Sequence, residues 1–302
     1  MIFKELLVFY IFIFLGWLLG RLKPEILGGS KVLSFLLVNL FLPSKVFLTF
    51  SQNFTVPFLQ KNYPTFFISI GILLLLSLLS IPLSAWLTGE NYKKRVYRYS
   101  FVITNYGYMG YALIENVLGK GALANMITFC IPFVIYTYTV GYSLLTGEGK
   151  SLKKLLNTMT VSIALGCVCG LTGIVLPDVF QTVLSSASAC TGVLSMILTG
   201  LVIASFAPKE LLPDRETLVF SGLRLVALPV LVFGICKLLS LVMPLPETVY
   251  PFAVIVACMP CGLNTVVFPR LIGEDCRQGA RMVLYSHIFS MLTIPLWMLI
   301  LL

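Results

Sequence analysis

Long apolar runs separated by short polar gaps make up almost the whole chain. A helix needs about 20 mainly apolar residues to cross the hydrocarbon of a bilayer. Ten such runs fall at residues 6–20, 32–50, 63–87, 100–118, 122–145, 155–176, 183–207, 218–242, 249–272 and 282–302. They are too long and continuous for the alternating strands of a transmembrane barrel. The sequence therefore predicts an all-α integral membrane protein with ten transmembrane helices.

The two halves of the chain carry similar stretches in matching places. A shift of 154 residues places the stretch that begins at Gly110 on the stretch that begins at Asn264, and Gly119 on Gly273. These stretches lie in the fourth and ninth runs. Because the first half contains five spans, an odd number, the second half enters the membrane from the opposite face. We therefore predict two inverted five-helix repeats, residues 1–150 and 151–302.

Residues that interrupt helices stand at or just before both matched stretches. The fourth run contains TNYGYMG at 104–110, and the ninth contains CMPCGLN at 258–264. Proline removes a backbone donor, and glycine lowers the cost of leaving helical geometry. Because unpaired backbone groups are costly in hydrocarbon, a break persists only beside protein, water or a ligand. We expect broken, crossing helices four and nine, although these residues could also serve only for kinks or close packing.

The two predicted breaks form a candidate site for a small organic anion. Secondary transporters with inverted repeats bind their substrates near the membrane midplane, at discontinuous helices. Each break would expose a helix N-terminus, whose positive dipole end favours a carboxylate. The candidate substrate-binding residues are Asn105, Tyr106, Gly107, Gly110, Pro260, Gly262, Asn264 and Lys45.

Several ionisable residues lie within the apolar runs. Lys45 either reaches the interface as an anchor, the slightly favoured interpretation, or binds a substrate carboxylate. For Arg224 and Lys237, near the ends of the eighth run, the anchoring interpretation is favoured more strongly. Glu115 and the sole histidine, His287, are candidates for carrying a coupling proton, and Glu115 could instead help to bind a cation. The favoured alternatives are an interfacial carboxylate and a neutral histidine that bonds to a neighbouring helix.

Basic residues are distributed unevenly between the gaps. The odd-numbered gaps carry fourteen: Arg21, Lys23, Lys31, Lys93, Lys94, Arg95, Arg98, Lys150, Lys153, Lys154, Lys209, Arg215, Arg277 and Arg281. The opposite side carries only Lys4, Lys61 and Lys120. The positive-inside rule then predicts a multi-pass protein of the cell membrane with both termini outside the cytoplasm. Arg270 fits the same rule, although it could also draw anions towards the site.

Composition agrees with this interpretation. The 302 residues are 58% hydrophobic and 11% charged, whereas soluble proteins carry about 25% charged residues. The net charge of +9 does not indicate nucleic acid, because the basic residues lie in short gaps. The eight cysteines lie almost entirely within apolar runs and are expected to pack without forming disulfides. We expect the lipid bilayer and a second copy of the chain, in a homodimer, as partners. We expect no metal and no cofactor apart from a possible coupling ion, H⁺ or Na⁺.

Three segments together resemble the auxin efflux carrier family, including its bacterial organic-acid members. They are ACMPCGLNTVVFPRLIGED at 257–275, TNYGYMG at 104–110 and NLFLP at 39–43. The resemblance implies a fold similar to that of the bile acid/sodium symporters, with substrate at the crossing of spans four and nine. In that fold, spans one, two, six and seven form a scaffold and the other six form a mobile transport domain. This chain has Ala112 where the family pattern has proline, so the resemblance supports a break less strongly in the fourth span.

The expected function is secondary active or facilitative transport of a small organic anion by alternating access. A ligand-binding membrane sensor or a channel is the alternative, because a sequence does not show alternating access. An intramembrane enzyme is disfavoured, because the sequence contains neither His-Glu-x-x-His nor Gly-x-Ser-x-Gly and has no aspartate within a span.

Overall fold

The computed structural model describes residues 2–147, 156–242, 249–271 and 273–301. Within these ranges the secondary structure is helical, with short connections and no strand. Seven helices in them are long and apolar enough to cross a membrane. The all-α prediction is therefore confirmed. The predicted boundary between residues 150 and 151, and the lysines at 150, 153 and 154, lie outside the described residues.

The described part of the first half, residues 2–147, contains twelve helical segments, of which η2, η3 and η4 are π-helical turns. They are α1 (Ile2–Leu22), η1 (Pro24–Gly29), α2 (Ser30–Leu36), η2 (Leu37–Phe41), α3 (Leu42–Asn53), α4 (Val56–Leu87), α5 (Asn91–Val102), η3 (Tyr106–Gly110), α6 (Tyr111–Leu118), α7 (Lys120–Tyr136), η4 (Thr137–Gly141) and α8 (Tyr142–Thr146). The segments from η1 to α3 run on without interruption, as do those from α7 to α8.

The described part of the second half repeats this pattern of long and interrupted helices. Its segments are α9 (Thr158–Thr172), α10 (Asp178–Ala204), η6 (Pro208–Leu211), α11 (Arg215–Gly222), η7 (Leu223–Ala227), α12 (Leu228–Val242), α13 (Val249–Cys258), α14 (Asn264–Leu271) and α15 (Arg277–Leu301). Seven of the ten predicted runs fall on the seven long helices. The other three fall on α9, on α5 and α6, and on α13 and α14, which are shorter. The number of ten spans stays a prediction.

The outer surface has the polarity expected of a protein in lipid. On α4, Phe67 and Leu78 are 65% and 66% exposed, whereas Ser69, Ser80 and Ser84 are buried. A helix of a soluble protein would place the serines outside and the apolar side chains inside. The arrangement on α4 is therefore that of a helix whose outward face contacts lipid.

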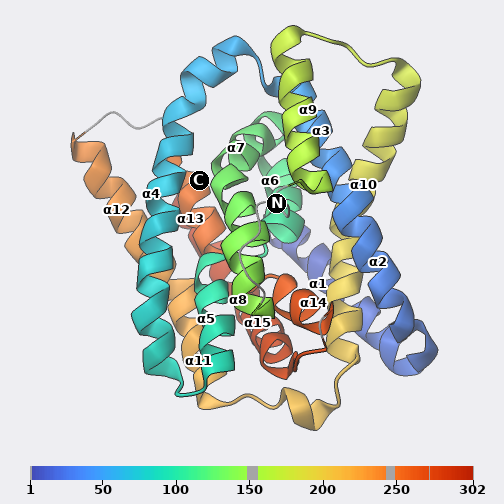
Figure 1. The fold of residues 1–302 in the computed structure, drawn as a ribbon, viewed down its shortest axis with the longest axis vertical. Coiled ribbons are helices and arrows are strands. Elements are labelled where there is room, and N and C mark those ends of the chain that lie inside the picture. The colour runs from blue at the N-terminus through green and yellow to red at the C-terminus, as the bar shows by residue number, and fades with distance from the viewer. Residues whose placement is uncertain (1, 148–155, 243–248, 272, 302) are drawn as a thin grey trace.

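Glycines bring two pairs of helices into close contact. A Cβ at Gly200 of α10 would lie 2.0 Å from the Ile13 backbone oxygen of α1. A Cβ at Gly170 of α9 would lie 2.6 Å from the Phe50 backbone oxygen of α3. Small residues that let backbones approach are a common means of helix association in membranes. Because α10 also packs on α3, α1, α3, α9 and α10 form one closely packed group, part of which lies on the right of Figure 1.

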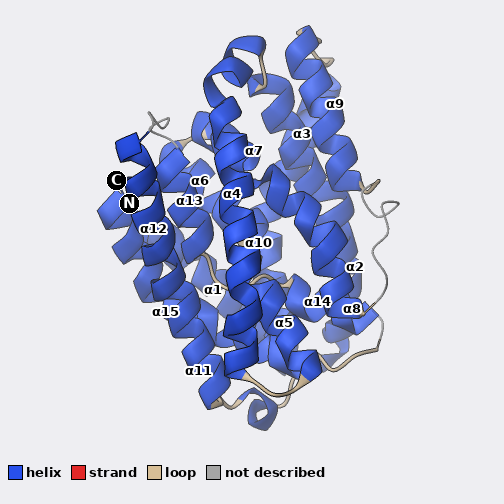
Figure 2. Cartoon of the chain, turned by 60° about the vertical axis from the view of Figure 1, so that its left-hand side comes forward, coloured by secondary structure: helices blue, strands red, loops and turns tan. Residues whose placement is uncertain are grey.

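The connections between helices lie at two ends of the molecule. Those from α4 to α5 and from α10 to α11 lie at the lower end in Figures 1 and 2, and those from α3 to α4 and from α9 to α10 lie at the upper end. The end of α15 lies near the start of α1 in both views, in the upper half of the molecule. The two termini therefore lie on the side opposite the first pair of connections.

Candidate functional site

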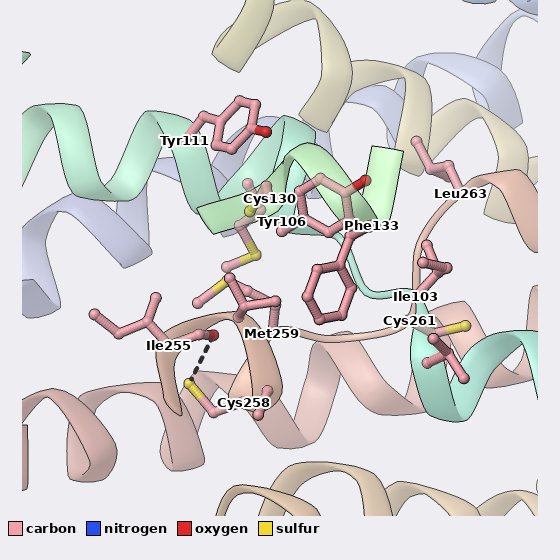
Figure 3. Packing of buried hydrophobic residues seen from close by; sticks show 14 of the residues in the cluster. Ile103, Tyr106, Tyr111, Cys130, Phe133, Ile255, Cys258, Met259, Cys261 and Leu263 are labelled. Carbon is pink, nitrogen blue, oxygen red and sulfur yellow. Dashed lines mark hydrogen bonds between the residues drawn. The ribbon is translucent and has the colours of Figure 1, made fainter. Parts of the chain in front are cut away.

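Two helices are interrupted where the sequence predicts breaks. Residues 103–105 between α5 and η3 are not helical, and neither are residues 259–263 between α13 and α14. The two interruptions meet, because Thr104 and Cys261 form an isolated antiparallel β-bridge. Figure 3 shows these stretches side by side, with Ile103 and Cys261 next to each other. The fourth run is thus interrupted although Ala112 replaces the proline of the family pattern.

The interrupted segments satisfy part of each other's backbone hydrogen bonding. The Asn105 amide donates to the Pro260 carbonyl at 2.8 Å, and the Cys261 amide donates to Ser286 Oγ at 2.9 Å. A Cβ at Gly262 would lie 3.1 Å from the Thr104 backbone oxygen, so glycine suits this close approach. Such pairing lowers the cost of leaving helical geometry inside a membrane.

A small cavity of about 50 Å³, here called the crossing cavity, lies where the interruptions meet. Of the predicted site residues, it is lined by Asn105, Tyr106, Gly107, Gly262 and Asn264. Pro260 takes part in the crossing through its carbonyl but does not line the cavity. Gly110 lies behind it, where an added Cβ would be 2.9 Å from Met126 Cε.

Residues from two helix starts with unpartnered backbone donors line the crossing cavity. The N–H groups of Tyr106, Gly107 and Tyr108 begin η3, and those of Leu263 and Asn264 lie at the start of α14. None of these five has a hydrogen-bond acceptor within the described residues, and all five residues line the cavity. The first N–H groups of a helix lack intrahelical partners, and the dipole adds positive potential there. The cavity therefore provides donors that suit an anion.

His287 contacts the crossing cavity indirectly, through Asn105. His287 Nδ1 lies 2.7 Å from the Val283 carbonyl, which can only accept, so Nδ1 carries the hydrogen. In the neutral ring, Nε2 then accepts from Asn105 Nδ2 at 3.1 Å. Asn105 Oδ1 is left without a partner in the described chain, which costs about 1–3 kcal/mol for a buried acceptor. This geometry fits the hydrogen-bonded histidine that the sequence favoured, and its neutral state stays a prediction.

Lys45 and Glu115 form an ion pair between α3 and α6. Lys45 is 4% exposed, so the anchoring interpretation of this residue is wrong. The pair lines a second cavity of about 290 Å³, here called the lysine cavity, which also contains Lys120. Leu42 precedes Lys45 by one helical turn and Tyr111 precedes Glu115 by one turn, and both line the crossing cavity. The ion pair therefore lies one turn from that cavity.

A third cavity of about 180 Å³, here called the arginine cavity, lies between α2, η2, α10 and α14. It contains Lys31, Asn39 and Arg270, and Arg270 donates to Ser205 Oγ at 2.9 Å. Along the continuous segments from α2 to α3, residues 30–39 line the arginine cavity, Leu42 lines the crossing cavity and residues 45–53 line the lysine cavity. The crossing cavity therefore lies between the other two.

The two predicted anchors of the eighth run differ. Lys237 is exposed, with Nζ 4.9 Å from the centroid of the Tyr250 ring, as an anchoring residue would be. Arg224 is 0% exposed, and its three guanidinium nitrogens have no hydrogen-bond partner within the described residues. The anchoring interpretation of Arg224 is therefore wrong.

Sequence reasoning missed part of the wall of the crossing cavity. Tyr108 of η3, Thr137 and Tyr138 of η4, and Met159 of α9 also line it. The polar triplet 137–139 interrupts the fifth apolar run and was the available signal for η4. Met159 carries no such signal, because an apolar residue in an apolar run does not show what it faces.

The chain is similar in sequence to known transport proteins. The sequence profile of a family described as membrane transport protein matches residues 1–155 and 150–298. The chain is also 25% identical to an uncharacterized transporter of Methanocaldococcus jannaschii, in an alignment that covers 96% of each chain.

Proposed function

Because the chain belongs to the membrane transport protein family, that of the auxin efflux carriers, we propose that it carries a small organic anion across the cell membrane by alternating access. The substrate binds at the crossing cavity, where the interruption after α5 meets the interruption after α13. A carboxylate is the anionic group that best fits the donors described above.

The observation that carries this proposal is that five residues whose N–H groups have no acceptor within the described chain line one cavity. Two helix starts from opposite halves of the chain point their positive ends at the same place, which is the arrangement that transporters use for substrate carboxylates. A carboxylate that leaves water needs such donors to replace its hydration. Neutral amides and backbone groups supply them without placing a permanent charge at the midplane.

Two further features support inverted repeats with a moving and a fixed part. Gly119 after α6 and Gly273 after α14, which match in the sequence, have φ angles of 84° and 76°. The closely packed group of α1, α3, α9 and α10 corresponds to spans one, two, six and seven, the expected scaffold. We infer that the interrupted helices move against this group together with α4, α7, α8, α11, α12 and α15.

The two outer cavities give the anion a route on each side. The arginine cavity forms the cytoplasmic entrance, where Lys31 and Arg270 attract anions. The lysine cavity forms the opposite entrance, and there Glu115 holds Lys45 until a substrate carboxylate competes for it. Both cavities lie between the scaffold helices and an interrupted helix, since α10 lines each of them.

Flux into proteoliposomes tests the proposal. Purified protein is screened by thermal shift against acetate, lactate, succinate and benzoate, because ligand binding raises stability by mass action. The radiolabelled form of the acid with the largest shift is then used for uptake and counterflow, with empty liposomes as the control. Saturable uptake with counterflow supports a carrier. Binding without flux would indicate a sensor, and flux that does not saturate would indicate a channel.

A further inference from the structure

The Asn105 side chain differs from the other polar groups at the crossing cavity in its hydrogen-bonding character. The backbone groups at the two helix starts are donors, whereas the unbonded polar group of Asn105 is Oδ1, a buried acceptor with no partner among the described residues, because its NH₂ group is bonded to His287 Nε2. A carboxylate beside Oδ1 would meet a second partial negative charge. The neutral His287 therefore holds the Asn105 amide in the orientation that is unfavourable for an anion.

Protonation of His287 would reverse this orientation. Nδ1 is committed to the Val283 carbonyl, so an added proton must bind Nε2, which then becomes a donor. The NH₂ group of Asn105 cannot accept from it. If the amide turns by about half a rotation around its Cβ–Cγ bond, Oδ1 accepts from Nε2–H and the NH₂ group takes the former position of Oδ1. The cavity then gains a donor where it had an acceptor.

We propose that His287 is the binding site of a coupling proton, and that the Asn105 amide transmits its protonation to the anion in the crossing cavity. This inference rests on the proposed anion site and adds its coupling ion and a positioning residue. One proton and one carboxylate bind together, so that the loaded site gains no net charge. The proton arrives from the cavity, because Asn105 is the group that covers Nε2.

Among the described residues, no carboxylate is bonded to His287 that would serve in place of the anion. Burial disfavours an unpaired imidazolium. On α15 itself, Ser286 and Ser290 are neutral, and on α1 the Tyr10 hydroxyl is bonded to Ser290 Oγ at 2.7 Å. Other titratable groups of the described residues in this region are Cys258 at the end of α13, Cys261 after it, Tyr99 of α5 and Arg224 of η7. The nearest acidic group bonded to α15 is Asp214, which pairs with Arg281 near the start of that helix.

Linkage then makes binding of the two ions mutually favourable. If the anion binds the protonated form better, the proton binds the anion-loaded form better by the same factor. With one proton taken up for each anion, affinity falls by up to about tenfold per pH unit as pH rises. A sodium ion is the other candidate for the coupling cation, because Asn105 Oδ1 could coordinate it. Sodium-dependent and pH-independent binding would therefore overturn the proposal.

The sole histidine makes a direct measurement possible on the wild-type protein. Labelling with ¹⁵N-histidine gives signals from His287 alone, and solid-state NMR in proteoliposomes distinguishes the two tautomers from the imidazolium. We expect the neutral Nδ1–H tautomer without ligand at about pH 7. Addition of saturating succinate, or whichever of the four acids gives the largest thermal shift, should convert it to the imidazolium. A ring that stays neutral with the acid bound at about pH 5.5 would overturn the proposal.

The variant His287→Gln separates coupling from binding. Glutamine can donate to the Val283 carbonyl and accept from Asn105 without titrating. Calorimetry in buffers of different ionisation enthalpy counts protons taken up with the acid. We expect about one proton for the wild type, none for His287→Gln, and a pH-independent, weaker affinity in the variant. Ser290→Ala, on the same helix, is the control and should keep the wild-type proton uptake.

The outcomes also separate this inference from the proposed function. If the acid binds and is transported with the same pH dependence in His287→Gln as in the wild type, only the role of His287 is wrong. If none of the four acids binds or moves, the anion site itself is wrong and the inference falls with it. The NMR result on the wild type decides the matter if His287→Gln does not fold.

Discussion

Asn105 and Asn264 occupy different environments at the crossing. Asn105 is 1% exposed, and its NH₂ group is bonded to His287, whereas Asn264 is half-buried at the start of α14. Both line the crossing cavity. Either side chain could therefore bond to a ligand in that cavity.

Alanine substitution of either asparagine should abolish transport while leaving expression intact. Each change removes a polar group from the wall of the crossing cavity, and loss of one hydrogen bond to a charged ligand costs about 1.5–3 kcal/mol, or roughly tenfold or more in affinity. Uptake in proteoliposomes measures the effect. Asn62→Ala is the matched control, because Asn62 is also buried but bonds only to the Phe58 carbonyl of its own helix. Wild-type rates in both cavity variants would remove these residues from the site.

The ion pair of Lys45 and Glu115 should have a measurable coupling energy. Glu115→Gln leaves a buried ammonium without its counter-charge, and we expect a loss of about 1–3 kcal/mol of stability, between the values for exposed and fully buried pairs. The double variant with Lys45→Met should lose less than the sum of the two single variants. Thermal unfolding in detergent gives the comparison. Additive losses would show that the two charges do not stabilise each other.

At the scale of elements, the close contact between α1 and α10 depends on glycine. In Gly200→Ala the new Cβ would lie 2.0 Å from the Ile13 backbone oxygen, so the helices must separate. Overpacking of this kind costs about 1–3 kcal/mol, and we expect a lower melting temperature. Gly71→Ala is the control, because a Cβ at Gly71 of α4 meets nothing within 4 Å. Equal melting temperatures for the two variants would contradict a glycine-dependent contact.

The interruptions could be predicted because glycine, proline and asparagine in an apolar run have few other roles. Pro260 and Gly262 marked the break after α13 by residue type alone. The partners of these segments could not be predicted. The β-bridge joins Thr104 to Cys261. The Cys261 amide also donates to the Ser286 hydroxyl, and nothing in the sequence marks this serine as a partner. Only the fold brings such distant residues together.

For the molecule as a whole, the sequence indicated membrane insertion but not which charges would be buried. Lys45 and Glu115 form an ion pair although they are 70 residues apart in the chain. The sequence contains no pattern that predicts this contact. Arg224 was expected at an interface because it follows the start of the eighth run by a few residues. Apolar periodicity locates a residue along a helix, whereas burial depends on which helices pack around it.

The orientation predicted by the positive-inside rule can be tested by fusions. The connections that begin near Gly89 and Phe206 carry most of the basic residues in the described odd-numbered gaps and lie at the end opposite the termini. The positive-inside rule places that end in the cytoplasm. Alkaline phosphatase, which is active only outside the cytoplasm, should therefore be active after Leu302 and inactive after Gly89. Green fluorescent protein at the same two positions should give the opposite pattern. Activity of the phosphatase after Gly89 would mean that the basic connections face outward. In that case the arginine cavity, with Lys31 and Arg270, would be the outer entrance for the anion.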